Sequence, residues 1–285
     1  MRRFFLFVLV PGIAIFGATF WVAANGSVDV EALKTRFSSL IAPYIDIATR
    51  WLNQPHVVPL EPQGWQSVPL KDRLQLRGFI SGQPVFIRIT KQNSKLDLFM
   101  KERAGWRLFQ TYDICRWSGS LGPKIREGDG QSPEGFYEVT KTALNPNSNY
   151  HLSFNLGFPN AFDRAKGRSG SFLMVHGICA SVGCFAMTNP GIDDIYTLVA
   201  AALTAGQASV PVHAFPFRMT DAAMLAQANN ENMPFWTNLK QAWDLFEETK
   251  SPPQSYVCPG PSYGFSVSAT TSKPLPAACK RIAGL

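Results

Sequence analysis

The chain has few of the residues that build metal centres, and they do not occur at metal-binding spacings. Its 285 residues include four histidines and five cysteines, spread widely along the sequence. No two cysteines form a C-x-x-C pair and no two histidines form an H-x-x-x-H pair, the spacings typical of zinc sites. We therefore expect no metal ion and no other cofactor.

Charged residues are also sparse, at 16% of the chain. The formal net charge is +7, which alone would be compatible with binding to nucleic acid. The lysines and arginines are scattered, however, and no basic run is interleaved with aromatic residues, so nucleic acid is not an expected partner. An anionic cell wall or membrane surface suits this charge at least as well. The chain has no internal repeat, and its 46% hydrophobic content is ample for a buried core.

One long apolar run begins the sequence. Arg2 and Arg3 are followed by Phe4 to Ala24 without one charged residue. Basic residues before an apolar run predict an export signal over residues 1–24. Small residues at its end offer a cleavage site, but about 20 apolar residues can also span a bilayer uncleaved. A signal peptide and an inner-membrane anchor therefore both stay open, and either one places the rest of the chain in the periplasm.

The remaining sequence predicts an α+β protein. Ser27 can cap a helix, and residues 53–68 are rich in proline, so residues 25–70 are predicted to form a helical stalk and linker. From Leu74 onward, short apolar stretches bounded by Gly, Pro or Asn predict a β-rich domain over 71–220. Its predicted strands are 85–89, 96–100, 106–114, 135–140, 150–156, 171–175 and 210–217. Helices are predicted over about 189–206, 221–229 and 233–249, and residues 221–285 form a C-terminal helical extension and tail.

The segment from His176 to Cys184 carries the strongest chemical signal. The histidine and the cysteine lie eight residues apart, and the cysteine follows a Ser-x-Gly turn. A thiol attacks as its thiolate, and a nearby imidazole can lower its pKa and accept its proton. Glycine at 183 permits a sharp turn and leaves N–H groups to face an oxyanion. The pattern predicts acyl transfer through a thioester, with Cys184 as nucleophile, His176 as general base, and the N–H groups of Gly183 and Cys184 as oxyanion donors.

This segment resembles the catalytic domain of the L,D-transpeptidase family (the YkuD type), in its short-spaced proteobacterial murein branch. The resemblance covers roughly residues 75–220 and rests on Gly122–Lys124, Glu127–Tyr137, Asn145–His151, Phe158–Arg164, His176-Gly177 and Ser181–Cys184. It implies a β-rich L,D-transpeptidase-like fold and a periplasmic enzyme. Such an enzyme acylates its cysteine with a peptidoglycan stem peptide, at diaminopimelate, and passes the acyl group to an amine. A wall-attached lipoprotein is a further partner that the resemblance admits.

The resemblance also implies roles for individual residues. The carbonyl of Gly177 is expected to orient the imidazole of His176. Because diaminopimelate carries free carboxylates, arginines are expected along the substrate groove. The candidate substrate contacts are Tyr150, His151, Asn155, Arg164, Arg168 and Ser181. Ser181 is also expected to stabilise its turn through a bond from its hydroxyl to the backbone.

Two departures from the family pattern leave the acyl acceptor open. Typical members carry His-Gly-Cys followed shortly by arginine, whereas here Val182 stands at that histidine position and Ala186 and Met187 follow Phe185. An L,D-carboxypeptidase or amidase that releases a cross-link or a wall-bound protein is therefore an alternative. A non-catalytic wall-binding module is a third hypothesis. The presence of both His176 and Cys184 argues against it. A papain-like protease is disfavoured because its local cysteine signature is absent.

The four other cysteines allow three disulfide pairings. Cys258 and Cys279 bracket a Pro/Gly/Ser-rich tail, and a bond between them would tie that tail down. Cys179 is a rival nucleophile three residues from His176, but no glycine precedes it. We expect it to act in packing or as a disulfide partner.

Overall fold

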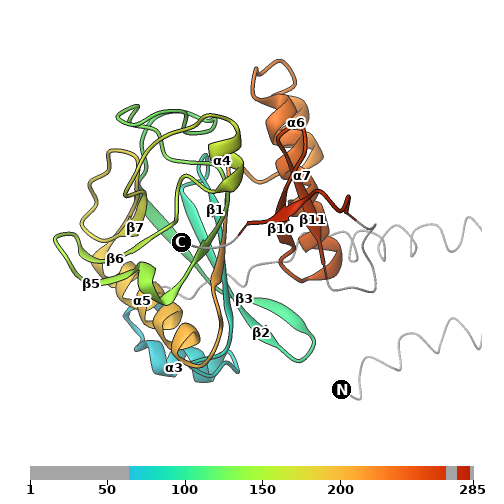
Figure 1. The fold of residues 1–285 in the computed structure, drawn as a ribbon. Helices are drawn as coiled ribbons and strands as arrows, with labels where there is room; N and C mark the ends of the chain where they lie inside the picture. Colours follow the sequence, from blue (N-terminus) through green and yellow to red (C-terminus); the bar gives the residue numbers. More distant parts are fainter. Residues whose placement is uncertain (1–63, 268–274, 283–285) are drawn as a thin grey trace, which may run out of the picture. The chain divides into compact units, whose positions relative to one another are not determined.

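The computed structural model describes residues 64–267 and 275–282 (Figure 1). Contacts divide the chain after Glu61, and all described residues belong to the second unit, Pro62–Leu285. The predicted export segment and nearly all of the predicted stalk and linker lie outside the described residues. Within those residues, no helix is both long enough and apolar enough to cross a membrane.

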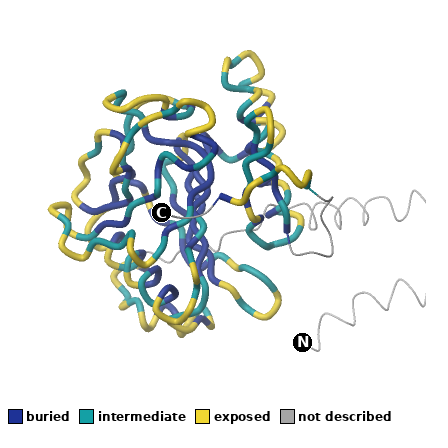
Figure 2. The backbone as a smooth tube through the Cα atoms, viewed as in Figure 1, coloured by how far each residue is buried: buried dark blue, intermediate teal, exposed yellow. Residues whose placement is uncertain are grey.

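A nine-stranded mixed sheet forms the centre of this unit, in the order β4-β9-β1-β2-β3-β8-β7-β6-β5. The strands are β1 (Val85–Thr90), β2 (Lys95–Glu102), β3 (Gly105–Arg116), β4 (Gly135–Val139), β5 (Leu144–Ser148), β6 (His151–Asn155), β7 (Met174–His176), β8 (Phe185–Met187) and β9 (Val210–Phe215). Neighbours are antiparallel except for the pairs β1–β9 and β7–β8, which are parallel. Buried backbone follows the central strands in Figure 2.

Helices flank this sheet, and together they confirm the predicted α+β class. They are α3 (Leu70–Leu76), α4 (Ala161–Ala165), α5 (Asn189–Thr204), α6 (Asp221–Ala226) and α7 (Met233–Thr249), with short 3-10 turns η1 (Trp65–Ser67) and η2 (Lys141–Ala143). The predicted start of α5 is confirmed, because Thr188 accepts a hydrogen bond from the N–H of Gly191 at 3.2 Å and proline follows in the first turn. Ile192, Ile195 and Val199 bury its apolar face in the main core.

The region around Leu74 is helical rather than the start of the strands. Leu74 lies in α3, whose Arg73 is buried and donates to Gln110 at 2.5 Å and to Asp194 at 2.6 Å. These bonds join α3 to β3 and α5. Contacts this distant in sequence override a local apolar pattern, which explains why the pattern alone placed strands here.

The C-terminal region contains the two predicted helices, but its tail is not irregular. It forms a second sheet of β10 (Gln254–Cys258), β11 (Ser262–Ser266) and β12 (Lys280–Arg281), in the order β11-β10-β12. The predicted Cys258–Cys279 disulfide is confirmed, and it lies where β12 pairs with β10. A second hydrophobic core joins this region to strands β4 and β9 of the main sheet, and includes Phe136, Phe215, Trp236, Trp243, Tyr263 and Phe265. Figure 1 shows α6, α7, β10 and β11 beside that sheet.

Candidate active site

His176 and Cys184 are positioned by two neighbouring parallel strands. His176 is the last residue of β7, and Cys184 immediately precedes β8. In the ladder His176 lies opposite Ala186, and Val175 lies opposite Phe185. Because side chains alternate between the two faces of a strand, this register places His176 and Cys184 on the same face as diagonal neighbours. The sheet therefore brings together the two residues predicted to carry the chemistry.

The imidazole of His176 is held as predicted by the carbonyl of Gly177. Nδ1 lies 2.6 Å from that oxygen, and the side chain is buried. A carbonyl only accepts, so Nδ1 carries the proton and Nε2 is left with a lone pair. Burial lowers the pKa of His176 below its usual value, although the bond to Gly177 opposes this shift. The imidazole is therefore a neutral base in the resting protein.

Gly177 has no room for a side chain. A Cβ there would lie 2.8 Å from Oδ1 of Asn189 and 3.0 Å from the carbonyl oxygen of Tyr150. Its N–H donates to that same carbonyl at 3.0 Å and to Leu152 at 3.2 Å. Glycine is thus required for the backbone to pack closely behind the imidazole.

Cys184 is the free cysteine among the five and is partly exposed. Its sulfur accepts a hydrogen bond from the N–H of Met174 at 3.4 Å and donates to the carbonyl of Phe172 at 3.5 Å. Burial raises the pKa of the thiol, an effect opposed by the bond from Met174 and by the charge of Lys124. Among the described residues the thiol makes no hydrogen bond to His176. The expected lowering of the thiol's pKa by the imidazole is therefore absent, and the resting pair is neutral.

Three serine hydroxyls hold the turn before the nucleophile. Ser181 donates to the carbonyl of Cys184 at 2.7 Å, which confirms its predicted role in the turn, and Ser132 donates to the same oxygen at 3.1 Å. Ser118 lies 2.8 Å from the Ser181 hydroxyl and accepts the N–H of Gly183 at 2.6 Å. The Gly183 N–H is thus engaged with Ser118, and the structure does not present it as an oxyanion donor.

The backbone at Gly183 nevertheless needs glycine. Its φ is +112°, in the region that L side chains rarely adopt, and a Cβ would lie 3.2 Å from Leu173. Gly183 therefore shapes the turn that delivers the thiol.

Sequence reasoning missed Lys124 and the serines at 118 and 132 as parts of the site. Lys124 is buried, and its ammonium donates to Asp129 at 2.5 Å and to the carbonyl of Arg126 at 2.9 Å. Its charge acts on Cys184 from 60 residues away in sequence. Lys124 lies in a stretch that carries the family resemblance. Its burial and the effect of its charge on the thiol identify it as part of the site.

The loop between the two strands is tied at two points. Cys179 forms a disulfide with Cys115, near the end of β3. Of the two roles expected for this rival nucleophile, packing or a disulfide, it has the second. The N–H of Ile178 donates to Oδ1 of Asn189, at the start of α5, at 2.9 Å. Cys184 is thus the cysteine that keeps a free thiol.

Of the predicted substrate contacts, the structure brings Tyr150 and Ser181 to the site. The Tyr150 ring lies 4.7 Å from the imidazole of His176, centroid to centroid, and is 49% exposed. It therefore forms an open wall beside the base.

The other candidates are engaged elsewhere. Nε2 of His151 lies 2.6 Å from Asp193 on α5, and Asn155 accepts the N–H of Gly157 at 2.9 Å within its own turn. Arg164 is exposed and donates to the carbonyl of Pro159.

Arg168, also predicted to contact substrate, is engaged in the interior in this structure. Its guanidinium donates to the buried carboxylate of Asp163 at 2.9 Å and lies over the rings of Phe162 and Phe235. Its charge is already paired in the interior, and holding a substrate carboxylate instead would leave the buried Asp163 unpaired.

No metal site is apparent in the described ranges, where no three His, Cys, Asp or Glu side chains gather in a way that could hold an ion. The thiol of Cys184 and the imidazole of His176 stay the predicted reactive groups of this site.

Comparison with known proteins gives a close relative. The chain is 49% identical over 181 residues to the Escherichia coli K12 protein described as "Putative L,D-transpeptidase YafK", covering 64% of this chain and 74% of that protein, and the E. coli O157:H7 protein gives the same values. No family model matches.

Solved structures are more distant. The helical cell shape determining protein Pgp2 of Campylobacter jejuni (K307A mutant) shares 21% identity at a TM-score of 0.40, over 64% of this chain and 65% of that chain. Bdellovibrio bacteriovorus Bd1075 shares 18% at 0.35, over 60% and 63%. The chain thus spans slightly less than two thirds of these structures. The identity and coverage of the E. coli relative do decide the family: the chain belongs to the YafK family of L,D-transpeptidase homologues.

Proposed function

We propose that this protein is a periplasmic cysteine acyl transferase that acts on peptidoglycan stem peptides, in the manner of the short-spaced branch of YkuD-type L,D-transpeptidases. The observation that carries the proposal is the pair formed by His176 at the end of β7 and Cys184 just before β8. Cys184 is free and partly exposed, and on the same face of the sheet His176 has its Nδ1 fixed by Gly177. The family relationship supports the substrate class, and the apolar run after Arg3 supports export.

The reaction begins from a neutral pair. When a stem peptide binds, the Cys184 proton passes to Nε2 of His176, and the sulfur attacks the carbonyl carbon of diaminopimelate. The bond from that carbon to the next residue breaks, and the leaving amine takes the proton from His176. A thioester remains on Cys184. An incoming amine or water gives a proton to His176 as it displaces the sulfur, and His176 returns that proton to the departing thiolate. Burial of both groups keeps charge separation out of the free enzyme and confines it to the substrate complex.

The oxyanion of the tetrahedral intermediate needs a donor. Since Gly183 N–H is bonded to Ser118, we assign this role to the N–H of Cys184 itself. Ser181 and Ser132 fix the carbonyl of that residue and thereby orient its backbone.

A second candidate is hydrolytic release of a protein bound to the wall. Phe172, whose carbonyl accepts from the thiol, and Ile178 and Val182 on the link before Cys184 expose 73%, 46% and 87% of their surface. Exposed apolar side chains favour contact with a protein partner, whereas a stem peptide is small and largely polar. Water would then be the acceptor and a polypeptide the leaving group.

Incubation of the purified full-length chain with isolated sacculi distinguishes the outcomes. New 3–3 cross-links indicate an amine acceptor, shortened stems indicate water, and released polypeptide indicates the second candidate. Cys184→Ala is the matched control, because it removes the sulfur and leaves the turn intact. Unchanged sacculi with the wild-type protein, or equal products with Cys184→Ala, would refute the proposal.

A further inference from the structure

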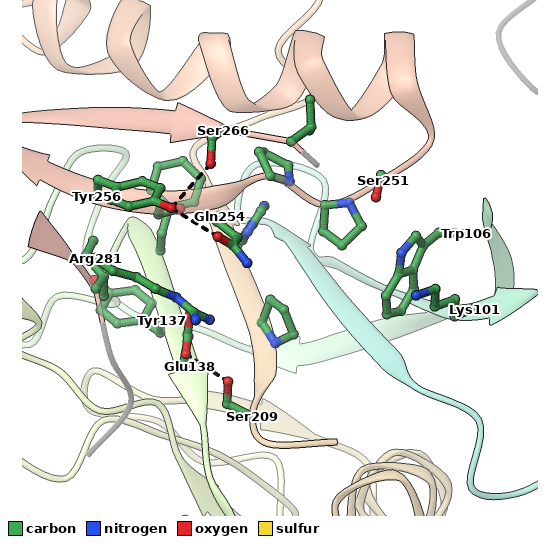
Figure 3. Close-up of a pocket in the computed structure, with 18 residues that line it drawn as sticks. Lys101, Trp106, Tyr137, Glu138, Ser209, Ser251, Gln254, Tyr256, Ser266 and Arg281 are labelled. Atoms are coloured by element: carbon green, nitrogen blue, oxygen red, sulfur yellow. Dashed lines mark hydrogen bonds and ion pairs between the residues drawn. The ribbon is translucent and has the colours of Figure 1, made fainter. Parts of the chain in front are cut away.

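A cavity of about 590 Å³ lies away from the thiol, between the main sheet and the small C-terminal sheet (Figure 3). Its lining comes from β4 and β9 on one side and from β10, β11 and β12 on the other, with Lys101 of β2 and Trp106 of β3 at one end. In the main sheet, β9 is separated from β8 by β1, β2 and β3. At about 4.8 Å per strand that separation amounts to roughly 19 Å. The cavity is therefore distinct from the site of Cys184.

A buried histidine without a hydrogen bond lines this cavity. His213 on β9 is 2% exposed and contacts the rings of Phe86 and Phe136 at 4.7 and 4.8 Å. Among the described residues none forms a hydrogen bond with its imidazole. Burial, with the nearby charge of Arg88, lowers the pKa of His213 to about 3, so the ring is neutral and offers one donor and one acceptor. A buried polar group without a partner is uncommon and marks a place where a ligand can supply one.

Further polar groups line the same cavity. Tyr256 donates to Oε1 of Gln254 at 3.0 Å, which leaves the amide nitrogen of Gln254 as a donor with no partner among the described residues. Arg281 is paired with Glu138 at 3.3 Å, and Glu138 also accepts from Ser209 at 2.8 Å. Because Glu138 already neutralises this arginine, Arg281 is not free to bind a phosphate or another anion.

Aromatic side chains complete the lining. Trp106 and Lys101 lie at one end of the cavity and Tyr256 lies towards the other, as Figure 3 shows. Flat aromatic faces beside neutral donors and acceptors suit a ligand whose surface alternates C–H groups with hydroxyl and amide groups. A sugar ring that carries an acetamido group has this composition.

We propose that this cavity binds an N-acetylated saccharide unit of a glycan strand. His213 and Gln254 hydrogen-bond its hydroxyl and acetamido groups, and Trp106 packs on its ring. The identity of the sugar rests on the proposed function, because the glycan is the one that bears the stem peptide. The cavity then holds the strand while its peptide reaches Cys184.

Titration calorimetry of the full-length chain with tri-N-acetylchitotriose tests the proposal, with cellotriose as the ligand that lacks acetamido groups. We expect saturable binding of the first and at least about tenfold weaker binding of the second, the loss equivalent to one hydrogen bond. His213→Phe keeps an aromatic ring but removes both nitrogens, and Trp106→Ala removes the platform. Each is expected to weaken binding about tenfold or more, whereas Tyr150→Ala, at the active site, is expected to leave it unchanged.

Acylation of Cys184 by a soluble stem peptide, followed by intact mass, is measured in parallel. Both cavity variants should acylate as the wild type does. Saccharide binding without any acylation would refute the proposed chemistry but support the cavity. No binding at millimolar trisaccharide, equal binding of cellotriose, or binding unaffected by Trp106→Ala overturns the proposal, and the tryptophan variant decides if His213→Phe does not fold.

Discussion

The indole N–H of Trp236 on α7 donates to Oε2 of Glu134 at 2.8 Å, and the other oxygen of Glu134 lies 3.0 Å from the ammonium of Lys91. Both charged side chains are fully buried. Lys91 also donates to the carbonyls of Gly122 and Ser132 at 2.9 Å each, and the hydroxyl of Ser132 holds the carbonyl of Cys184. The C-terminal helix is thereby connected to the nucleophile through one buried ion pair.

This connection predicts a large effect for Glu134→Gln. Removing one partner leaves the Lys91 charge buried without compensation, and the expected loss is about 3–5 kcal/mol in the free energy of unfolding. Trp236→Phe retains the ring and removes one donor, so we expect a loss of about 1–3 kcal/mol. Urea unfolding checks both values. A Glu134→Gln protein as stable as the wild type would contradict a stabilising role for the Lys91–Glu134 ion pair.

Acid should weaken the loop around Lys124. Burial tends to raise the pKa of Asp129, but hydrogen bonds from Lys124 and from the N–H groups of Arg126, Ile125 and Gln131 outweigh it and lower that pKa to about 2. Because the folded pKa lies below the unfolded value of about 3.9, the carboxylate stabilises the fold above that value, and this stability is lost as pH falls towards 2. Between pH 5 and about 2, the free energy of unfolding should fall less steeply for Asp129→Asn than for the wild type. Parallel plots of that free energy against pH would count against a stabilising role for the Asp129 carboxylate.

The thiol of the free enzyme should alkylate slowly at neutral pH. Since burial raises its pKa, the midpoint of its reaction with iodoacetamide should lie above the ordinary value of about 8.5. Lys124→Met removes a cation that favours the thiolate and should move the midpoint higher still. His176→Ala should lower turnover by about 10² to 10⁴ and leave this midpoint nearly unchanged. A midpoint below that of a free thiol would show that a resting ion pair exists after all.

Gly183→Ala should reduce activity far more than a comparable change elsewhere. Alanine there is strained by the positive φ and also meets Leu173 at 3.2 Å. Gly128 has a φ of +73°, and a Cβ added there would meet nothing within 4 Å, so Gly128→Ala is the matched control for strain alone. Rates of Cys184 acylation are the measurement, and equal rates in the two variants would remove the special role of the turn.

The Cys115–Cys179 bond should support stability more than chemistry. It joins residues 64 apart, for which loop-closure entropy gives about 4 kcal/mol. The Cys115→Ser/Cys179→Ser double variant should melt at lower temperature and still acylate Cys184 when assayed below its melting range. The Cys258→Ser/Cys279→Ser variant, which opens a 21-residue separation, is the control for a bond away from the site. A folded Cys179 variant that has lost acylation would reopen the choice of sulfur.

Sequence periodicity predicted well the elements that local spacing determines, and poorly the elements that depend on pairing with distant residues. The helix at Met233–Thr249 has the predicted bounds, because its apolar spacing is strong and Lys250 ends it in a left-handed conformation. By contrast, β12 is two residues long and depends on pairing with β10, which no local pattern signals. Strands this short are decided by tertiary contacts.

The same distinction separates the site residues. His176, Gly177 and Cys184 lie within one short segment, so their relation could be recognised in the sequence. The contributions of Ser118, Ser132 and Lys124 depend on a loop that returns to the nucleophile from more than 50 residues away. For Arg168, the position near the motif suggested a substrate contact, whereas its partner in the structure, Asp163, is buried in the interior.

The eight residues between β7 and β8 have a consequence for how such enzymes diversify. Adjacent parallel strands usually need a crossover of a dozen or more residues, and the short link is sufficient here because each strand has three. The reacting pair is fixed by the ladder, while Ile178 and Val182 stand on the link with their side chains in solvent. Substitutions at these two positions can therefore change what this surface contacts without disturbing the imidazole or the thiol. Chemistry and choice of partner are free to evolve separately within nine consecutive residues.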